Sequence, residues 1–509
     1  MSLISMKFVL FTGIAVGGYY LIPKKAQWVW LLVASYVYYL SAGAGVAGFL
    51  LFSTAVSFLA ALWMESLSKT NEKKTVIRKK KRRVLILALL FNFGMLGVLK
   101  YTNFAIENIN LVFGLQIPGQ NLILPLGISF YTFQSVGYVL DVYWERQEAE
   151  HNPFRYALFV SFFPQLLQGP IGRFSRLACQ LYEEHAFSWE KIERGVQRIL
   201  WGYFKKMVLA DNAGIFVDAI FGDLQTYKGL AIAGVLAYTV QLYGDFSGGM
   251  DVVIGIASMF GIELDENFKQ PFFARSITDF WHRWHITLGT WMKDYVFYPV
   301  SLSKWMGRFG KMAKKRFGKT IGRALPICLA NLIVFLVVGI WHGAAWKYIV
   351  YGMYNGVIIA VSGLLAKPYR EWKKKLHISD KSRGWICFQI LRTFLLVNIS
   401  WFFDRADTVK DALTMMKNAV VYWDPAALLT ISVGHSGTAY TAFSLMIISA
   451  GCVVLFVVSV LKERGVKIRE TIHTLPLVVR YGIYLALLFS IPMFGQPPAL
   501  TGGFIYAQF

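Results

Sequence analysis

Two histidines lie beside tryptophans in the apolar stretches of this chain. His285 belongs to FWHRWHITLGTW, which runs from Phe280 to Trp291, and His342 belongs to VVGIWHGAAW, which runs from Val337 to Trp346. A neutral imidazole can accept a proton, ligate a metal or relay protons, so a histidine in apolar surroundings is a candidate functional residue. A histidine that is merely hydrogen-bonded between two helices would give the same pattern, and that structural explanation stays open.

The residues around the first histidine predict which side chains face inward, provided that the segment is one helix. At about 100° per residue, an apolar stripe forms on one side and His285 lies at its edge. The members of this stripe are Phe280, Trp281, Trp284, Leu288 and Trp291. Asp279, His282 and Arg283 fall on a different, polar face. The pattern therefore predicts that His285 points inward and that His282 lies at an interface or in solvent.

The second histidine follows a long apolar run and is surrounded by small residues. Gly339, Gly343, Ala344 and Ala345 flank His342. Residues without bulky side chains allow a close approach by a second backbone or by a ligand. We therefore expect His342 to lie where another helix or a substrate comes very near.

Three kinds of chemistry fit such a pair of histidines. Metal ligation is disfavoured, because the helical wheel separates His282 from His285 and the four cysteines show no zinc spacing, so we expect no metal site. A proton relay in a transporter could use Asp141, Asp245 or Asp251, but the sequence shows no repeat symmetry. General-base catalysis needs only one neutral imidazole within reach of a hydroxyl, and this is the interpretation that we favour.

Composition places this site in a membrane protein. Of the 509 residues, 56% are hydrophobic and only 16% are charged, whereas a soluble domain would carry roughly 25% charge. Apolar runs long enough to cross ~30 Å of hydrocarbon recur along the chain, and they predict about eleven to thirteen crossings, with further re-entrant or interfacial helices. We expect an all-α polytopic fold that forms a single membrane domain over residues 1–509. The first apolar segment is expected to be a retained span rather than a cleaved signal.

The net charge of +23 comes from short basic blocks between the apolar segments. The blocks are Arg78–Arg83, Lys304–Arg323, Lys367–Lys375 and Lys462–Arg469. Lysine and arginine in short loops mark the cytoplasmic face, so we expect these blocks inside and Met1 outside. This placement explains the charge without nucleic acid, and we expect no nucleic-acid partner.

Several longer stretches resemble the membrane-bound O-acyltransferase family. They include DFWHRWHITLGTWMKDYVFYPV, GIWHGAAWKYIVYGMYNG, LPLGISFYTFQSVGYVLDVY, FVSFFPQLLQGPIGRF, SWFFDRAD and the closing GGFIYAQF. The chain is most similar to the bacterial branch that contains alginate O-acetylation and teichoic-acid D-alanylation membrane proteins. The resemblance implies helices around a central funnel, with His342 and His285 facing a tunnel as the catalytic pair. The family usually has arginine where this chain has His282.

Within that branch, a length of 509 residues makes the chain more similar to the polysaccharide O-acetylation type than to the shorter D-alanylation type. The resemblance implies a bacterial cytoplasmic-membrane enzyme that uses acetyl-CoA as its donor substrate and binds no cofactor. The acetyl group would pass to an exported or cell-surface polysaccharide such as alginate, through an extracytoplasmic acetyltransferase partner. Two other interpretations remain: transfer of D-alanine from a carrier protein to teichoic acid, and a non-enzymatic glycan channel in which the histidines act as a gate.

Six further residues are expected to bind substrate or to order the loops around it. The candidates for tunnel walls are aromatic: Trp281, Trp284, Trp341 and Tyr295. Simple packing would account for the same aromatic residues. Asp245 in YGDFSGG and Asn267 in DENFKQPF are candidates for ordering loops near the site. Basic residues of the segment Lys304–Arg323 could meet the phosphates of acetyl-CoA, although the positive-inside rule explains the same charges.

Overall fold

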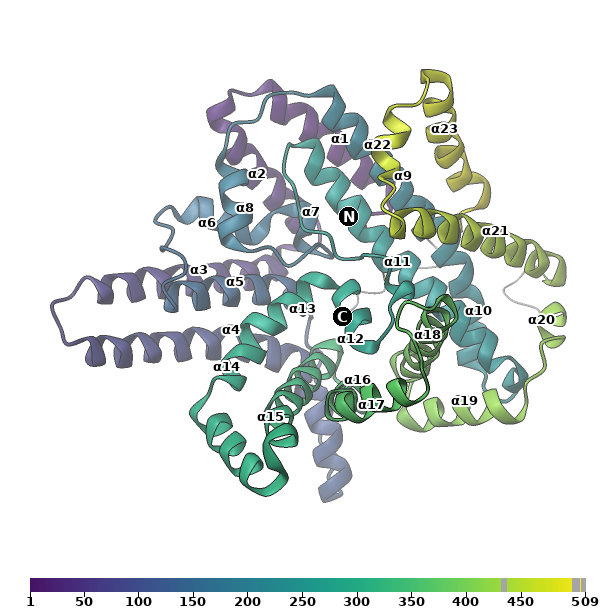
Figure 1. The fold of residues 1–509 in the computed structure, drawn as a ribbon. Coiled ribbons are helices and arrows are strands. Elements are labelled where there is room, and N and C mark those ends of the chain that lie inside the picture. Colours follow the sequence, from purple (N-terminus) through teal and green to yellow (C-terminus); the bar gives the residue numbers. More distant parts are fainter. Residues whose placement is uncertain (432–436, 497–503, 505–509) are drawn as a thin grey trace. The chain divides into compact units, whose positions relative to one another are not determined.

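The computed structural model describes residues 1–431, 437–496 and 504, with no account of the side chains of 429, 430 and 437–441. Helices make up nearly all of the regular structure in this part of the chain (Figure 1). The closing GGFIYAQF stretch lies outside the described residues except for Phe504. Contacts divide the chain into two compact units. Of the described residues, the first contains 1–203, 248–265 and 504, and the second contains 204–247, 266–431 and 437–496.

Over its described residues, the first unit is built from nine complete helices, one 3-10 turn and the C-terminal part of α11. The complete elements are α1 (Met6–Leu21), η1 (Lys24–Ala26), α2 (Gln27–Leu40), α3 (Ala44–Ser68), α4 (Lys74–Phe113), α5 (Ile128–Tyr143), α6 (Pro153–Ser161), α7 (Phe163–Leu166), α8 (Phe174–Tyr182) and α9 (Trp189–Tyr203). Helices α3, α4 and α5 pack against one another. Almost every residue of α5 is buried, including its serines and threonine.

The second unit carries both candidate histidines. Its elements are η2 (Phe204–Ala210), α10 (Asp211–Gly222), η3 (Lys228–Leu230), the N-terminal part of α11 (Ala231–Met259), η4 (Pro271–Phe273), α12 (Ile277–Arg283), α13 (Ile286–Met292), η5 (Lys293–Phe297), α14 (Tyr298–Ser301), α15 (Lys304–His342), α16 (Trp346–Leu364), α17 (Ala366–Lys375), α18 (Arg383–Arg405), α19 (Val409–Val421), α20 (Ala427–Thr430), α21 (Gly437–Glu463), α22 (Ile468–His473) and α23 (Leu477–Phe494). Both η2 and η5 are π-helical, a form that often marks functional sites.

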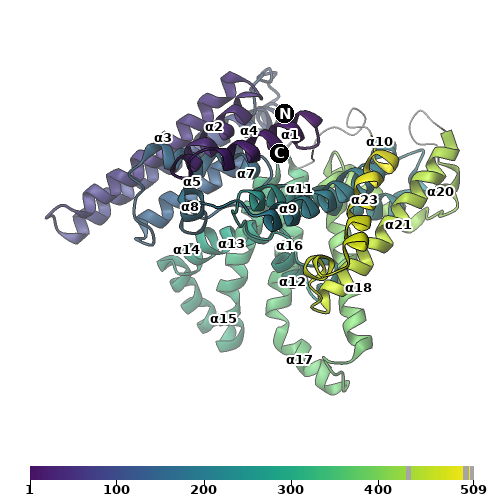
Figure 2. The same cartoon turned by 90° about the horizontal axis from the view of Figure 1, so that it is seen from above.

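Six of the described helices are long and apolar enough to cross a membrane. They are α3, α4, α15, α18, the segment Ala442–Glu463 of α21, and α23. A seventh crossing is added if α16 and α17, which meet at a 59° bend, form one broken span. In Figure 2, α17 lies beyond the end of α16, at the bottom of the view. The multi-pass, all-helical fold is confirmed, whereas the count of eleven to thirteen crossings requires shorter helices such as α1 to cross as well and stays a prediction.

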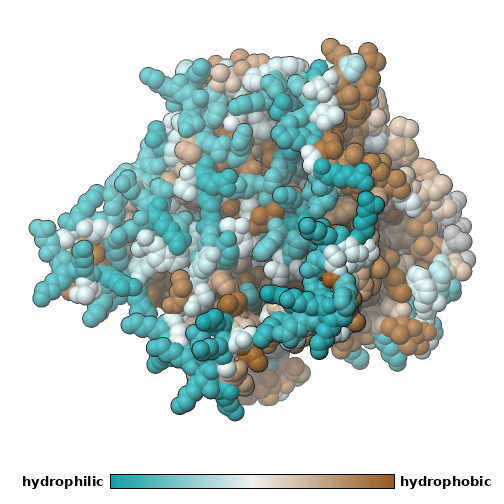
Figure 3. Space-filling model, viewed as in Figure 1, coloured by the Kyte–Doolittle hydropathy of each residue, from teal (hydrophilic) through white to brown (hydrophobic). Residues whose placement is uncertain are grey.

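Two of these helices expose most of their apolar side chains. Only 11% of the apolar window of α21 and 6% of that of α23 is buried. Figure 3 shows apolar side chains gathered over this region, on the right-hand side of the view. Apolar surface of this length is what a helix presents to lipid hydrocarbon, so we assign these faces to the bilayer.

The basic segment Lys304–Arg323 is a helical hairpin rather than a loop. Helix α15 begins at Lys304, capped by the Ser303 hydroxyl, and its course is interrupted at Gly318, which has φ +78° and ψ 174°. A side chain at this φ would be strained, so glycine permits the reversal. Lysine and arginine favour helix strongly, which explains why the segment does not form an open loop.

Helices α15 and α16 form the closest pair in the second unit. A Cβ atom at Gly339 would lie only 2.5 Å from the backbone oxygen of Tyr348 in α16. Glycine is therefore needed for the approach of the two backbones. The small residues beside His342 thus admit a neighbouring helix, as the sequence predicted, and this packing fixes the position of the histidine at the end of α15.

Candidate active site

His342 is the last residue of α15, where the chain turns toward α16. Its side chain is buried, with an exposed fraction of only 3%. Its ring stacks on Tyr348 at a centroid distance of 6.2 Å and meets the edge of Tyr351 at 5.2 Å. Both tyrosines belong to the neighbouring helix, so the α15–α16 packing sets the orientation of the imidazole.

His285 lies at a break between two short helices. Trp284 is extended, with φ −110° and ψ 128°, and His285 has φ +48° and ψ 53°, so the chain is not helical between α12 and α13. The single helix assumed from the sequence is therefore wrong. Its conclusion nevertheless holds: His285 is buried, whereas His282 is exposed. The imidazole points inward because the backbone leaves the helical conformation at Trp284 and His285, and a helical wheel assumes that it does not.

Asn267 holds this break in place. Its side-chain oxygen accepts hydrogen bonds from the backbone N–H of Thr287, at 2.9 Å, and from the Thr287 hydroxyl, at 2.7 Å. The backbone N–H of Ile286 donates to the carbonyl oxygen of Asn267 at 3.1 Å. Phe268, which follows Asn267, forms an antiparallel bridge with Trp284, which precedes His285. Asn267 thus satisfies the first donors of α13 and orders the loop around His285, whereas direct binding of substrate stays a prediction.

The two histidines come together against one indole. The ring of Trp341 lies 5.7 Å from that of His285 and 5.2 Å from that of His342, measured between centroids. Phe246 presents an edge to His285 at 4.8 Å. The imidazoles are near enough for electrostatic coupling. Segments more than fifty residues apart in the sequence therefore build one buried imidazole pair.

The other candidate wall residues occupy different positions. Trp284 is enclosed in aromatic packing, stacked on Phe280 at 5.4 Å and against Trp401 at 5.4 Å. Trp281 is half-buried, and its indole N–H donates to the side-chain oxygen of Asn355 at 3.3 Å. Tyr295 lies in the π-helical turn η5, where its ring packs on Trp291 at 5.0 Å. Trp341 is thus the wall candidate that touches both histidines, and the packing explanation suits Trp284 best.

Asp245 belongs to a buried ion-paired cluster. The ammonium group of Lys206 lies 2.6 Å from Asp245 and 2.7 Å from Asp211, and all three side chains are almost fully buried. Removal of one member would leave a buried charge without its partner, at a large energetic cost. The cluster joins η2, α10 and α11, and the residue after Asp245 is Phe246, which contacts His285. The geometry indicates a loop- and helix-ordering role, while a role in substrate binding stays a prediction.

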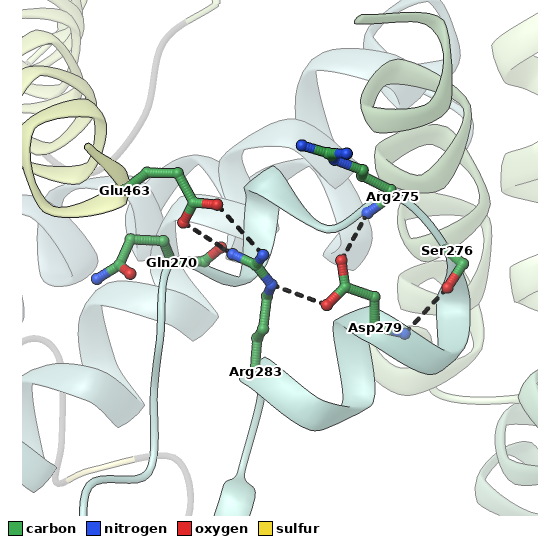
Figure 4. Close-up of polar contacts among 6 residues, drawn as sticks. All are labelled: Gln270, Arg275, Ser276, Asp279, Arg283 and Glu463. Atoms are coloured by element: carbon green, nitrogen blue, oxygen red, sulfur yellow. Dashed lines mark hydrogen bonds and ion pairs between the residues drawn. The ribbon is translucent and has the colours of Figure 1, made fainter. Parts of the chain in front are cut away.

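A second polar cluster fixes α12 directly before His285 (Figure 4). The guanidinium of Arg283 donates to Asp279 at 2.9 Å and makes two bonds, of 2.8 and 3.2 Å, to the carboxylate of Glu463 at the end of α21. A terminal nitrogen also donates to the backbone oxygen of Gln270 at 3.4 Å. The Ser276 hydroxyl caps α12 by accepting from the backbone N–H of Asp279. This is the polar face predicted from the sequence, with partners that the sequence did not indicate.

A carboxylate that sequence reasoning missed lies beside His342. In α18, Oδ1 of Asp404 is 4.0 Å from Nδ1 of His342, and Oδ2 accepts a hydrogen bond of 2.8 Å from the hydroxyl of Tyr238 in α11. Asp404 is buried, with 6% of its surface exposed. One signal was present in the sequence, because an ionisable residue within a long apolar helix is a functional candidate by default. Its partner could not be read from the sequence.

The arrangement suits acid–base chemistry by side chains. Two buried imidazoles and a carboxylate meet within one compact unit. Over residues 1–431, 437–496 and 504, no group of three or more His, Cys, Asp and Glu side chains is placed to hold a metal ion. A neutral imidazole in such a setting can take a proton from a hydroxyl that lies within hydrogen-bond reach.

Comparisons with known proteins show which proteins this chain is similar to. Residues 145–313 match the pattern of MBOAT, the membrane-bound O-acyltransferase family. The chain is 34% identical over 411 residues to the probable alginate O-acetylase AlgI of Pseudomonas syringae pv. tomato, covering 79% of this chain and 71% of that protein. It is 33% identical over 447 residues to the peptidoglycan O-acetyltransferase of Helicobacter pylori, covering 81% and 78%. The teichoic acid D-alanyltransferase of Bacillus subtilis is 30% identical over 291 residues, covering 55% and 68%.

Proposed function

This chain belongs to the membrane-bound O-acyltransferase family and is a multi-pass acyltransferase of the bacterial cytoplasmic membrane, and from this premise we propose that it moves an acetyl group from cytoplasmic acetyl-CoA for O-acetylation of an exported or cell-surface polysaccharide. Relatives that are similar over most of their length carry the names alginate O-acetylase and peptidoglycan O-acetyltransferase, which supports an acetyl group and a glycan acceptor. An extracytoplasmic acetyltransferase would act as the partner that delivers the group to the glycan.

The observation that carries this proposal is the buried imidazole pair at Trp341. In the proposed reaction, His342 accepts the proton of the acceptor hydroxyl while the oxygen of that hydroxyl attacks the carbonyl carbon of the thioester. The carbon–sulfur bond then breaks, and the thiolate takes up the proton from His342. The products are an O-acetyl ester and free CoA. A positioned base of this kind contributes on the order of 10²–10⁴-fold to the rate.

His285 is proposed to polarise the acyl carbonyl or to carry the proton onward. Its ring faces the same indole as His342, and its backbone is fixed by Asn267 rather than by a continuous helix. A rigid donor aimed at the place where charge develops stabilises an acyl-transfer transition state. Trp341, which contacts both rings, would form the wall between them.

The basic hairpin of α15 is proposed as the place where the phosphates of acetyl-CoA bind. Lys311, Lys314, Lys315, Arg316 and Arg323 are all exposed on it. Phosphate oxygens accept strong hydrogen bonds from charged amino and guanidinium groups. The cytoplasmic position expected for these basic residues is also where the donor is found.

The histidine variants test the catalytic assignment. His342→Ala should abolish transfer of radiolabelled acetyl from acetyl-CoA to polysaccharide, and His342→Gln should not restore it, because an amide cannot accept the proton. His285→Ala should lose most activity, and His285→Asn should keep a trace through its hydrogen-bonding amide. His282→Ala is the control, because this side chain is exposed, and it should stay near wild type. All values are normalised to membrane-inserted protein, and near-normal transfer by His342→Ala would disprove the assignment.

A second candidate is transfer of D-alanine to teichoic acid, since a D-alanyltransferase is similar over about half of this chain. The two functions differ in their donors. With acetyl-CoA as donor, purified protein supplied with its acceptor should transfer label without any carrier protein. Transfer that occurs only with a D-alanyl carrier protein would favour the second candidate.

A further inference from the structure

The carboxylate of Asp404 is held between two helices and directed at His342. Its Oδ2 is anchored by the Tyr238 hydroxyl, at 2.8 Å, and this leaves Oδ1 on the side of the imidazole. The ring of Tyr238 is itself packed edge-on against Trp401, at 6.3 Å. Both contacts are buried, so water cannot easily take the place of either partner. The position of the carboxylate is therefore set by α11 and α18 together.

The charges of Lys347 and Arg405 act on Asp404 from a distance, while both groups make their direct contacts elsewhere. The ammonium group of Lys347 donates to the backbone oxygen of Ala406 at 2.7 Å, and Arg405 pairs with Asp218 at 2.7 Å. A buried carboxylate needs compensation by hydrogen bonds or by an opposite charge. Among the described residues, Tyr238 supplies one hydrogen bond, and the imidazole of His342 is the group that faces the remaining oxygen.

From this geometry we propose that Asp404 is a positioning residue for His342, with Tyr238 holding Asp404 in place. The carboxylate orients Nδ1 of His342 as the protonated nitrogen, which makes Nε2 the nitrogen that accepts the proton of the acceptor hydroxyl. It also stabilises the imidazolium that exists until the thiolate is protonated. The separation of 4.0 Å is longer than a hydrogen bond, and such contacts commonly tighten only when substrate is bound. The inference rests on the proposed function of His342.

This arrangement also distinguishes the two histidines. His342 has a carboxylate at one ring nitrogen, whereas His285 is enclosed by Phe246 and Trp341. A carboxylate behind an imidazole makes that imidazole the better base, as in the serine-protease triad. The proton of the acceptor therefore goes to His342 rather than to His285.

The test compares Asp404→Asn with two other substitutions in membranes supplied with radiolabelled acetyl-CoA. Asp404→Asn should lower the apparent kcat by 10²-fold or more while the KM for acetyl-CoA stays within about twofold, because the amide can favour the wrong tautomer of His342. Asp404→Glu keeps a carboxylate and should retain at least about tenfold more activity than the asparagine variant. Tyr238→Phe keeps the carboxylate but removes the hydrogen bond that anchors it, and should lower kcat by about three- to tenfold.

Thr239→Val is the matched control. The Thr239 hydroxyl donates to Asn398 at 2.8 Å, so this contact also joins α11 to α18 but does not involve Asp404. Its activity should stay close to wild type. An Asp404→Asn enzyme with more than half of the wild-type kcat would overturn the inference, as would an equal loss in Thr239→Val. If His342→Gln is inactive while Asp404→Asn is fully active, only the positioning role of Asp404 fails. If His342→Gln is active, the base role of His342 fails and the positioning role fails with it. If the wild-type protein transfers no label from acetyl-CoA, the proposed function itself fails.

Discussion

Replacing Asn267 by alanine should release His285 from its position without touching the imidazole. The substitution removes the acceptor of two hydrogen bonds, from the backbone N–H and the hydroxyl of Thr287. Thr287 is buried, with 7% exposed, so these donors cannot turn freely to water. Each buried donor that loses its partner costs about 1–3 kcal/mol, and the hydroxyl can partly recover by rotation. We therefore expect a local loss of about 2–4 kcal/mol.

This loss is comparable with the strain that the loop carries. A residue other than glycine in the left-handed region costs about 1–2 kcal/mol, and His285 lies there with φ +48°. Without Asn267, the loop should relax toward an ordinary conformation and carry the imidazole away from Trp341. If the whole loss appears in the transition state, activity falls by about 30- to 1,000-fold, at 1.36 kcal/mol for each tenfold.

The assay is acetyl transfer normalised to inserted protein, together with thermal unfolding in detergent. Asn267→Asp keeps an oxygen in the same place and should be less damaging than Asn267→Ala. Thr287→Ser keeps both donors, so its activity should stay near that of the wild type. Thr287→Val loses the hydroxyl donor, so its activity should lie between those of the wild type and Asn267→Ala. Full activity in Asn267→Ala, or equal losses in all four variants, would refute the argument that Asn267 acts through the backbone of His285.

Three further predictions concern charge and orientation. Changing Lys314 and Lys315 to glutamate should raise the KM for acetyl-CoA severalfold with little change in kcat, and an unchanged KM would leave these lysines as topological signals only. In a cysteine-free background, a cysteine at Lys314 should resist an impermeant thiol reagent in intact cells, whereas one at Ala42 should react; the opposite pattern would reverse the topology. Arg283→Gln should reduce activity and thermal stability more than Glu463→Gln, because Arg283 also bonds within α12, and equal effects of the two variants would contradict this.

The sequence predicted the burial of the two candidate histidines better than it predicted the backbone that carries them. Residue type and apolar setting were enough to select His285 and His342, and both are buried. The small residues beside His342 correctly predicted a close helix approach, since side-chain volume acts locally. The helical wheel failed at His285 because the break depends on Asn267, which bonds across a gap of twenty residues. Such long-range hydrogen bonds leave no periodic signal in the sequence.

The same limit explains the other differences. Asp404 lies sixty-two positions beyond His342 in the sequence, and the two side chains come together because α15 and α18 both pack against α16. Asp245 was a reasonable candidate for ordering loops, but its charge partner Lys206 sits in a π-helical turn that composition alone does not predict. The charges of the segment Lys304–Arg323 led us to expect a cytoplasmic loop. The segment is helical, since a cytoplasmic position does not exclude a helix.

The backbone around the site suggests why a membrane acyltransferase departs from simple spanning helices. Inside a regular helix the backbone N–H and C=O groups are hydrogen-bonded to one another, and the side chains point outward around the axis. His342 lies at the end of α15 and His285 at the break before α13, where the chain can turn a side chain toward a common point. The exposed backbone groups at such breaks must then be satisfied by protein, because lipid cannot do so. The side chain of Asn267 does this for α13, so a site of this kind needs polar residues whose hydrogen bonds support the backbone.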